Sequence, residues 1–136
     1  MAPPKTVLFA CVHNAGRSQM AAALFNALAD PERARAVSAG TSPAERPHPE
    51  VVEVMAETGI DLSSAKPQRL SDALAASVDL LVTMGCGEAC PFVPGLETRD
   101  WELPDPKGLP PAEVRQIRER IRDRVATLLD EKGWAT

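Results

Sequence analysis

The stretch TVLFACVHNAGRSQMAA, residues 6–22, decides the fold of this chain of 136 residues. It begins with a continuous apolar run, Thr6–Val12, which is typical of a strand buried on both faces of a sheet. Residues 19–29 are rich in alanine and carry apolar side chains at helical spacing, so we predict a helix there. The intervening residues, from Cys11 to Ser18, therefore form a loop that joins a buried strand to a helix.

Further along the chain, strand and helix signals alternate. The apolar patterns predict strands at 36–39 and 79–84, helices at 50–58 and 70–76, and a long last helix that starts at Ala112 and ends at Gly133. The residues from Gly85 to Gly108 are expected to be irregular and, because the segment is long, functional. Alternating strands and helices indicate βαβ units, so we expect residues 1–136 to form one doubly wound α/β domain.

The composition excludes several classes of function. The net charge is −4 and the chain has no basic run, which argues against binding to nucleic acid or to an anionic membrane. We find neither a secretory signal nor a stretch long enough to span a bilayer. Three cysteines, an odd number, favour a reducing compartment such as the cytoplasm over a disulfide framework. A monomer is expected because no helix pattern leaves an apolar face exposed.

The loop CVHNAGRS, residues 11–18, has the composition of an anion site with a nucleophile at its base. Backbone N–H groups converge on the centre of such a loop, and the following helix adds partial positive charge. Gly16 permits the tight turn, and Arg17 can hold an oxyanion through two parallel hydrogen bonds. Among these donors Cys11 is expected to lose its proton readily, with Ser18 as a further donor to the sulfur.

Four segments together resemble a known family. These segments are CVHNAGRSQMA (11–21), SAGT (38–41), VTMGCGEACP (82–91) and DWELPDPKG (100–108). They resemble the low-molecular-weight tyrosine phosphatase fold and, more narrowly, the arsenate reductases built on that fold. The resemblance implies a four-stranded parallel sheet with helices on both faces.

The resemblance also implies roles for particular residues. The oxyanion, which is arsenate with phosphate or sulfate as mimics, would be bound by the loop residues His13, Asn14, Ala15, Gly16, Arg17 and Ser18. Asp105 would be the general acid that protonates the leaving oxygen. Cys11 would attack arsenate, Cys86 would attack Cys11, and Cys90 would then attack Cys86. The resulting Cys86–Cys90 disulfide would be reduced by thioredoxin, and the resemblance implies no cofactor and no metal.

Helix geometry adds a prediction about this disulfide. Side chains four residues apart on a regular helix have Cβ atoms about 5–6 Å apart. A disulfide needs Cβ atoms about 3.5–4.5 Å apart. Cys86 and Cys90 therefore cannot be bonded on an undistorted helix, and we predict that their segment rearranges between the reduced and the oxidised protein.

Other interpretations stay open. A reductase could depend on mycothiol as an external thiol, and the tight GCGEACP spacing resembles reductases of that actinobacterial type. A tyrosine phosphatase or a non-catalytic anion-binding module is a further alternative, although the chain has no tyrosine to flank an aromatic substrate.

A zinc site formed by the three cysteines and His13 fits no common zinc spacing. Ala22 stands where some reductases carry a potassium-binding glutamate, so no potassium site is predicted. His48, in a proline-flanked loop, is interpreted as a surface residue.

Overall fold

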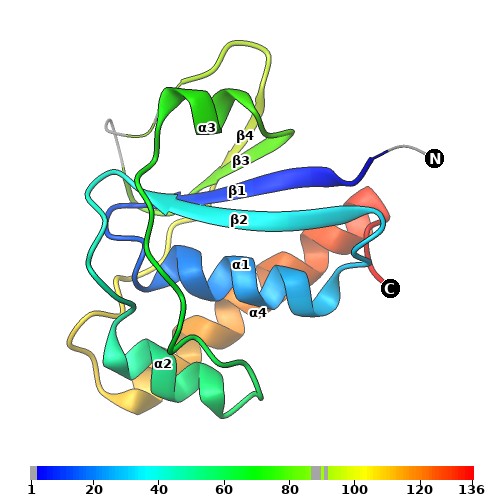
Figure 1. Ribbon diagram of the computed structural model, residues 1–136. Helices are drawn as coiled ribbons and strands as arrows, with labels where there is room; N and C mark the ends of the chain where they lie inside the picture. Colours follow the sequence, from blue (N-terminus) through cyan, green and yellow to red (C-terminus); the bar gives the residue numbers. More distant parts are fainter. Residues whose placement is uncertain (1–2, 87–89, 91) are drawn as a thin grey trace.

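Four strands and four helices make up the part of the chain that the computed structural model describes, namely residues 3–86, 90 and 92–136. In chain order they are β1 (Lys5–Cys11), α1 (Arg17–Leu28), β2 (Ala34–Gly40), α2 (Pro49–Ala56), α3 (Asp72–Ala76), β3 (Leu80–Thr83), β4 (Glu97–Asp100) and α4 (Pro111–Lys132). Figure 1 shows one central sheet with helices on both sides. The predicted fold class is confirmed.

The sheet has the strand order β2-β1-β3-β4, and every pairing is parallel. β1 is therefore a central strand: Val7 lies opposite Ala36 of β2 and opposite Leu80 of β3. This position explains the continuous apolar run, because a central strand of a parallel sheet is covered on both faces.

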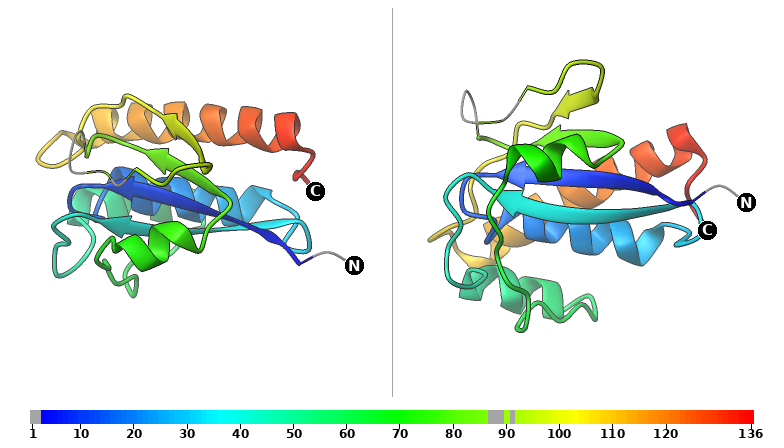
Figure 2. Two further views of the ribbon diagram at one scale, coloured as in Figure 1. Left: turned by 90° about the horizontal axis from the view of Figure 1, so that it is seen from above. Right: turned by 45° about the horizontal axis from the view of Figure 1, so that its top comes forward.

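Alternate side chains of β1 enter two separate hydrophobic clusters. Val7, Phe9 and Cys11 pack in the larger cluster, with residues of α1, α2 and α4. Leu8 and Ala10 point to the other face and pack in a smaller cluster, which includes Ala75 of α3. Figure 2 shows α3 on this face of the sheet. The second face therefore has a thinner cover than the first.

The segment after β3 completes the smaller cluster. Cys86 is buried in it, and Cys90, Val93 and Leu96 are half-buried against it. Cys86 and Cys90 are thus part of the packing on this face.

One element was predicted wrongly. β4, with the sequence ETRD, lies inside the segment from Gly85 to Gly108 that we expected to be irregular throughout. The strand is polar and mostly exposed because it is the edge of the sheet, so it carries no apolar pattern. The other predicted elements are present, with ends that differ by a few residues. Among the described residues, no helix combines the length and the apolarity that crossing a membrane requires.

Candidate active site

The carboxyl ends of three neighbouring strands bring the candidate residues together. Cys11 ends β1, the segment with Cys86 follows β3, and the chain that leaves β4 reaches Asp105. In parallel sheets ligands bind at this edge. The loop from Cys11 to Ser18 lies at its centre and leads into the N-terminus of α1.

The carbonyl groups of this loop are turned outward by hydrogen bonds. Backbone N–H groups of Thr41, Ser42, Ala44 and His48 donate to the carbonyl oxygens of Cys11, Val12, His13 and Ala15, at 3.1, 2.8, 2.9 and 2.9 Å respectively. The carbonyl of Asn14 accepts a further bond from the side-chain amide of Gln19 at 3.0 Å. Residues 41–48 therefore form an outer strap around the loop.

The N–H groups of the loop are left for a ligand. Within the described part of the chain, none of the backbone hydrogen bonds outside helices and strands is donated by residues 13–18. α1 begins at Arg17 without a side-chain cap and without an acidic residue in its first turn. A loop with its carbonyls bonded outside and its N–H groups unpaired, at a helix N-terminus, can bind a tetrahedral oxyanion.

A chain of hydrogen bonds ends at the sulfur of Cys11. The backbone N–H of Gln68 donates to Asn14 Oδ1 at 3.0 Å, which fixes the orientation of that buried amide. Asn14 Nδ2 therefore donates to Ser18 Oγ at 2.8 Å. Since Ser18 Oγ already accepts this bond, its own hydrogen is available to Cys11 Sγ, 2.8 Å away. The arrangement places a hydroxyl that can donate a hydrogen bond beside the nucleophilic sulfur.

Asn14 adopts a backbone conformation that this network makes possible. Its φ of 50° is the only positive value for a non-glycine residue in the described part of the chain. Asparagine tolerates this left-handed conformation better than most residues, and here the side chain is buried and fully bonded. Asn14 thus shapes the loop through its side chain.

Arg17 is held in place above the loop from two sides. Its Nη1 donates to the carbonyl oxygen of Leu103 at 3.0 Å, and its Nη2 lies 4.0 Å from Asp105 Oδ2. Gly85, with φ of 100°, gives the guanidinium room, because a Cβ atom at this position would overlap it. The side chain is only 11% exposed, so its remaining donors are largely shielded from bulk solvent.

Asp105 is placed by the packing of its neighbour. A Cβ atom on Gly16 would lie 2.8 Å from Cγ of Pro106, so the proline sits directly against the loop at the glycine. Asp105 Oδ1 accepts the backbone N–H of Lys107 at 3.0 Å, while the carboxyl group stays 45% exposed. The acid is therefore at the mouth of the loop, with one oxygen available.

Cys86 and Cys90 form a disulfide, and Cys11 is a free, buried thiol. The Cα atoms of Cys86 and Cys90 are 5.3 Å apart, and neither residue is helical. Cys86 is buried in the smaller cluster, and its Sγ lies 4.0 Å from the carbonyl oxygen of Ala10. Cys90 is half-buried. A reductant arriving from solvent would meet Cys90 first. Residues 87–89 lie outside the described residues, so the rearrangement predicted for this segment stays a prediction.

The structure brings the candidate residues His13, Asn14, Ala15, Gly16, Arg17, Ser18 and Asp105 together around the loop of Cys11; their chemical roles stay predictions. The interpretation of His48 as a surface residue was wrong, because His48 is half-buried against the loop. Sequence reasoning also missed Gln68 and the outer strap. The strap follows the carboxyl end of β2, at the same sheet edge as Cys11, and this position was the available signal.

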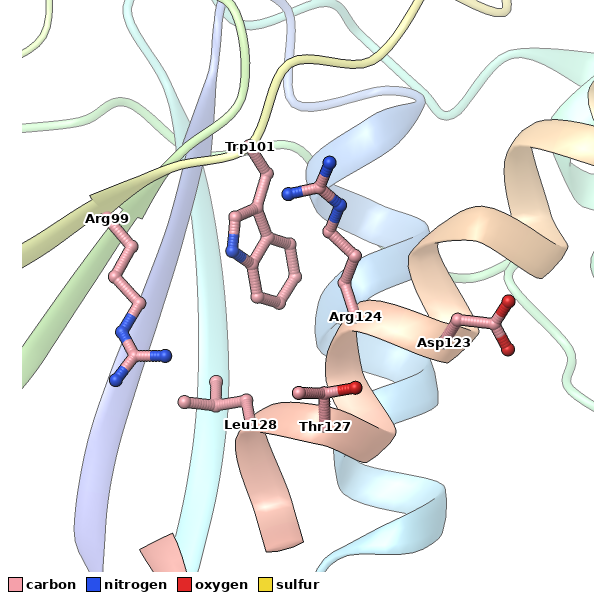
Figure 3. Close-up of a pocket in the computed structure, with 6 residues that line it drawn as sticks. All are labelled: Arg99, Trp101, Asp123, Arg124, Thr127 and Leu128. Atoms are coloured by element: carbon pink, nitrogen blue, oxygen red, sulfur yellow. The ribbon is translucent and has the colours of Figure 1, made fainter. Parts of the chain in front are cut away.

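A groove elsewhere on the molecule does not belong to this site. It has a volume of about 370 Å³ and lies between α4 and the chain around β4, with Trp101 at its base (Figure 3). Arg99 at its edge is paired with Glu97 and Glu131 and so has little charge left for a ligand. In the described part of the chain, no three histidine, cysteine or acidic side chains gather as a metal site would require.

Comparison with known proteins gives a consistent result. The family described as low molecular weight phosphotyrosine protein phosphatase matches residues 6–133. A provisionally named arsenate reductase of Halobacterium salinarum is 43% identical over 131 residues, which are 90% of this chain and 89% of that protein. The glutaredoxin arsenate reductase of Synechocystis is 32% identical over 128 residues, which are 92% of this chain and 96% of the relative.

A solved structure agrees with these relatives. The thioredoxin-dependent arsenate reductase of Corynebacterium glutamicum superposes with a TM-score of 0.83 at 40% identity. The match covers 97% of this chain and 63% of that chain, so the present chain spans less than two thirds of the length of the Corynebacterium protein.

Proposed function

This chain belongs to the low molecular weight phosphotyrosine protein phosphatase family, and we propose that it reduces arsenate to arsenite through a relay among its three cysteines. The observation that carries the proposal is the state of the sulfur atoms. Cys11 is a free thiol at the base of the anion loop, while Cys86 and Cys90 are bonded to each other. This is the arrangement that a completed relay would leave.

The first step forms a covalent bond to arsenic. Arsenate lies in the ring of N–H groups of residues 13–18, opposite Arg17, and the thiolate of Cys11 attacks arsenic. An arsenic–oxygen bond breaks, and Asp105 gives the leaving oxygen a proton so that it departs as water. Ser18 stabilises the thiolate before the attack.

The second and third steps move electrons. The thiolate of Cys86 attacks Cys11 Sγ, the sulfur–arsenic bond breaks, and its electron pair stays on arsenic, which leaves as arsenite. Cys90 then attacks Cys86, which frees Cys11 and forms the Cys86–Cys90 disulfide. A dithiol protein of the thioredoxin class then reduces this disulfide by attacking the half-buried Cys90. The enzyme would then be ready for a new arsenate ion.

Three kinds of electron donor could regenerate the reduced enzyme. Relatives of similar identity are named for thioredoxin and for glutaredoxin, and a mycothiol-dependent transferase is a third possibility. A chain that closes its own disulfide needs a dithiol reductant and does not need a small thiol at the arsenic adduct. This reasoning supports thioredoxin over mycothiol. We further propose that the enzyme acts in the cytoplasm and as a monomer.

Steady-state assays with exchanged donors test the proposal. Arsenite formation is measured with thioredoxin, thioredoxin reductase and NADPH, and in parallel with mycothiol and its redoxin. The wild type should turn over with thioredoxin, and Cys90→Ser should lose that activity. Equal activity of both proteins with mycothiol alone would contradict the relay. Hydrolysis of an aryl phosphate without arsenite formation would favour the phosphatase alternative.

A further inference from the structure

The only two histidines of the chain lie together beside the anion loop. His13 belongs to the loop and His48 to the outer strap, yet their ring centroids are 6.4 Å apart, in an edge-to-face arrangement. Both side chains are half-buried. Histidine is the side chain whose ordinary titration changes its charge between pH 5 and 8.

His48 is held rigidly in this position. Its backbone N–H donates to the carbonyl oxygen of Ala15 at 2.9 Å. Pro47 and Pro49 flank it and restrict the backbone on both sides. The imidazole Cδ2 lies 3.4 Å from the point where a side chain on Gly16 would begin, so the ring packs against the loop itself.

The residue type is unusual for its place in the fold. His48 is the N-cap of α2, where serine, threonine, aspartate or asparagine would accept a hydrogen bond from the helix. The side chain of His48 makes no such bond. A departure from a local rule of this kind often marks a functional position, and here the imidazole contacts the loop in place of capping the helix.

Charged groups of α2, of the anion loop and of the segment after β4 act on His48. Burial lowers the pKa of His48, and His13 and Lys107 act in the same direction. Glu50 of α2 and Asp105 act in the opposite direction. His48 therefore gains its proton at a lower pH than an ordinary histidine. A dianion bound in the loop would add a much stronger attraction for that proton.

We propose that His48 is a pH-dependent part of the oxyanion site, so that an anion in the loop and a proton on the His48 imidazole bind cooperatively. The inference rests on the proposed function only in that the loop binds an oxyanion. Linkage makes the effect reciprocal. Protonation of His48 increases the affinity for the anion, and a bound anion increases the affinity of His48 for its proton by the same factor. A positive charge several ångströms from a dianion should change affinity by about tenfold.

Sulfate is the appropriate probe because it stays a dianion throughout the pH range of the experiment. Its affinity is measured by calorimetry between pH 5.5 and 8 in Cys11→Ser, which removes the titration of the thiol, and in the same protein with His48→Gln. We expect sulfate to bind about tenfold more tightly at pH 5.5 than at pH 8, and the added substitution to remove most of this difference.

Proton NMR tests the same inference without changing His48. The protein should give two imidazole Hε1 resonances, and the His48→Gln spectrum assigns them. Saturating sulfate should shift the titration midpoint of His48 upward by about one pH unit. A midpoint that does not move while sulfate is bound would overturn the inference, even though the anion site would stand. Sulfate binding that survives Arg17→Ala unchanged would place the anion elsewhere and would overturn both the site and the inference.

Discussion

Cys11 and Cys86 are buried on opposite faces of the central sheet. Cys11 packs with the residues of α1, α2 and α4, whereas Cys86 packs in the smaller cluster, with its sulfur against the carbonyl oxygen of Ala10. Thiolate attack needs direct approach of one sulfur to the other. In the relay, therefore, Cys86 has to leave its place in the smaller cluster before it can reach Cys11.

Substitution of Cys90 should trap this intermediate. In Cys90→Ser the relay stops after Cys86 has attacked Cys11, so arsenate should convert both remaining thiols into a Cys11–Cys86 disulfide with about one arsenite released per chain. Peptide mapping without reductant identifies the bond, and Cys11→Ser, which should release no arsenite, is the control. If Cys11 can still be alkylated after arsenite has appeared, the order of the relay is wrong.

Removal of the Ser18 hydroxyl should make Cys11 less reactive. Ser18 Oγ lies 2.8 Å from the sulfur, and loss of a hydrogen bond from this hydroxyl to a thiolate should slow alkylation by about tenfold. The rate with iodoacetamide at pH 7 is measured in Cys86→Ser/Cys90→Ser, where Cys11 alone reacts. Ser77→Ala, an exposed serine at the end of α3, should leave this rate unchanged. Equal rates with and without the Ser18 hydroxyl would show that it does not stabilise the thiolate.

Alanine substitutions at two glycines with positive φ distinguish the effect of backbone strain from the effect of displacing Arg17. Gly85 and Gly95 have φ of 100° and 81°, so alanine is strained at both and should cost about 1 kcal/mol of stability in each case. Only at Gly85 would the new methyl group overlap Arg17, since nothing lies within 4 Å of the corresponding point at Gly95. Gly85→Ala should therefore weaken sulfate binding and arsenate turnover by about tenfold or more, as expected for a displaced oxyanion donor. Equal losses in the two variants would mean that Arg17 is not displaced.

Glu57 should make stability depend on pH in the acid range. Hydrogen bonds from Arg115 and Arg118 of α4 lower the pKa of Glu57 to about 2, from an ordinary value of 4.5. Because the folded-state pKa is lowered, the stabilisation is fully present above pH 4.5 and is lost as the pH falls towards 2. Glu57→Gln should lower the melting temperature by a few degrees at pH 7, since exposed pairs contribute little. The exposed Glu45, in the outer strap, provides the control variant Glu45→Gln. A deficit of Glu57→Gln that stays constant down to pH 2 would contradict this assignment.

The strand–loop–helix unit around Cys11 could be predicted from the sequence because its signals are local. The apolar run of β1, the small residues of the loop and the apolar spacing in α1 are each visible in a short window. β4 could not be recognised, since an edge strand with exposed side chains owes its conformation to its partner β3 and not to its own residues.

The residues that hold the anion loop in place were harder to predict than the loop itself. Gln68 acts through a backbone N–H, which any residue except proline could supply, so the sequence has no signal for it. His48 is different, because it is one of two histidines and follows β2 at the carboxyl edge of the sheet. Its position relative to Cys11 depends on how the strap packs, and that is a property of the tertiary structure.

The central claim is that three thiols of one chain reduce one arsenate ion. The most direct measurement reduces the protein fully, removes the reductant, adds arsenate alone, and counts free thiols and arsenite. The account predicts that the number of free thiols falls from three to one, that about one arsenite is released per chain, and that the bonded pair is Cys86–Cys90. Three thiols remaining, with no arsenite released, would contradict the relay.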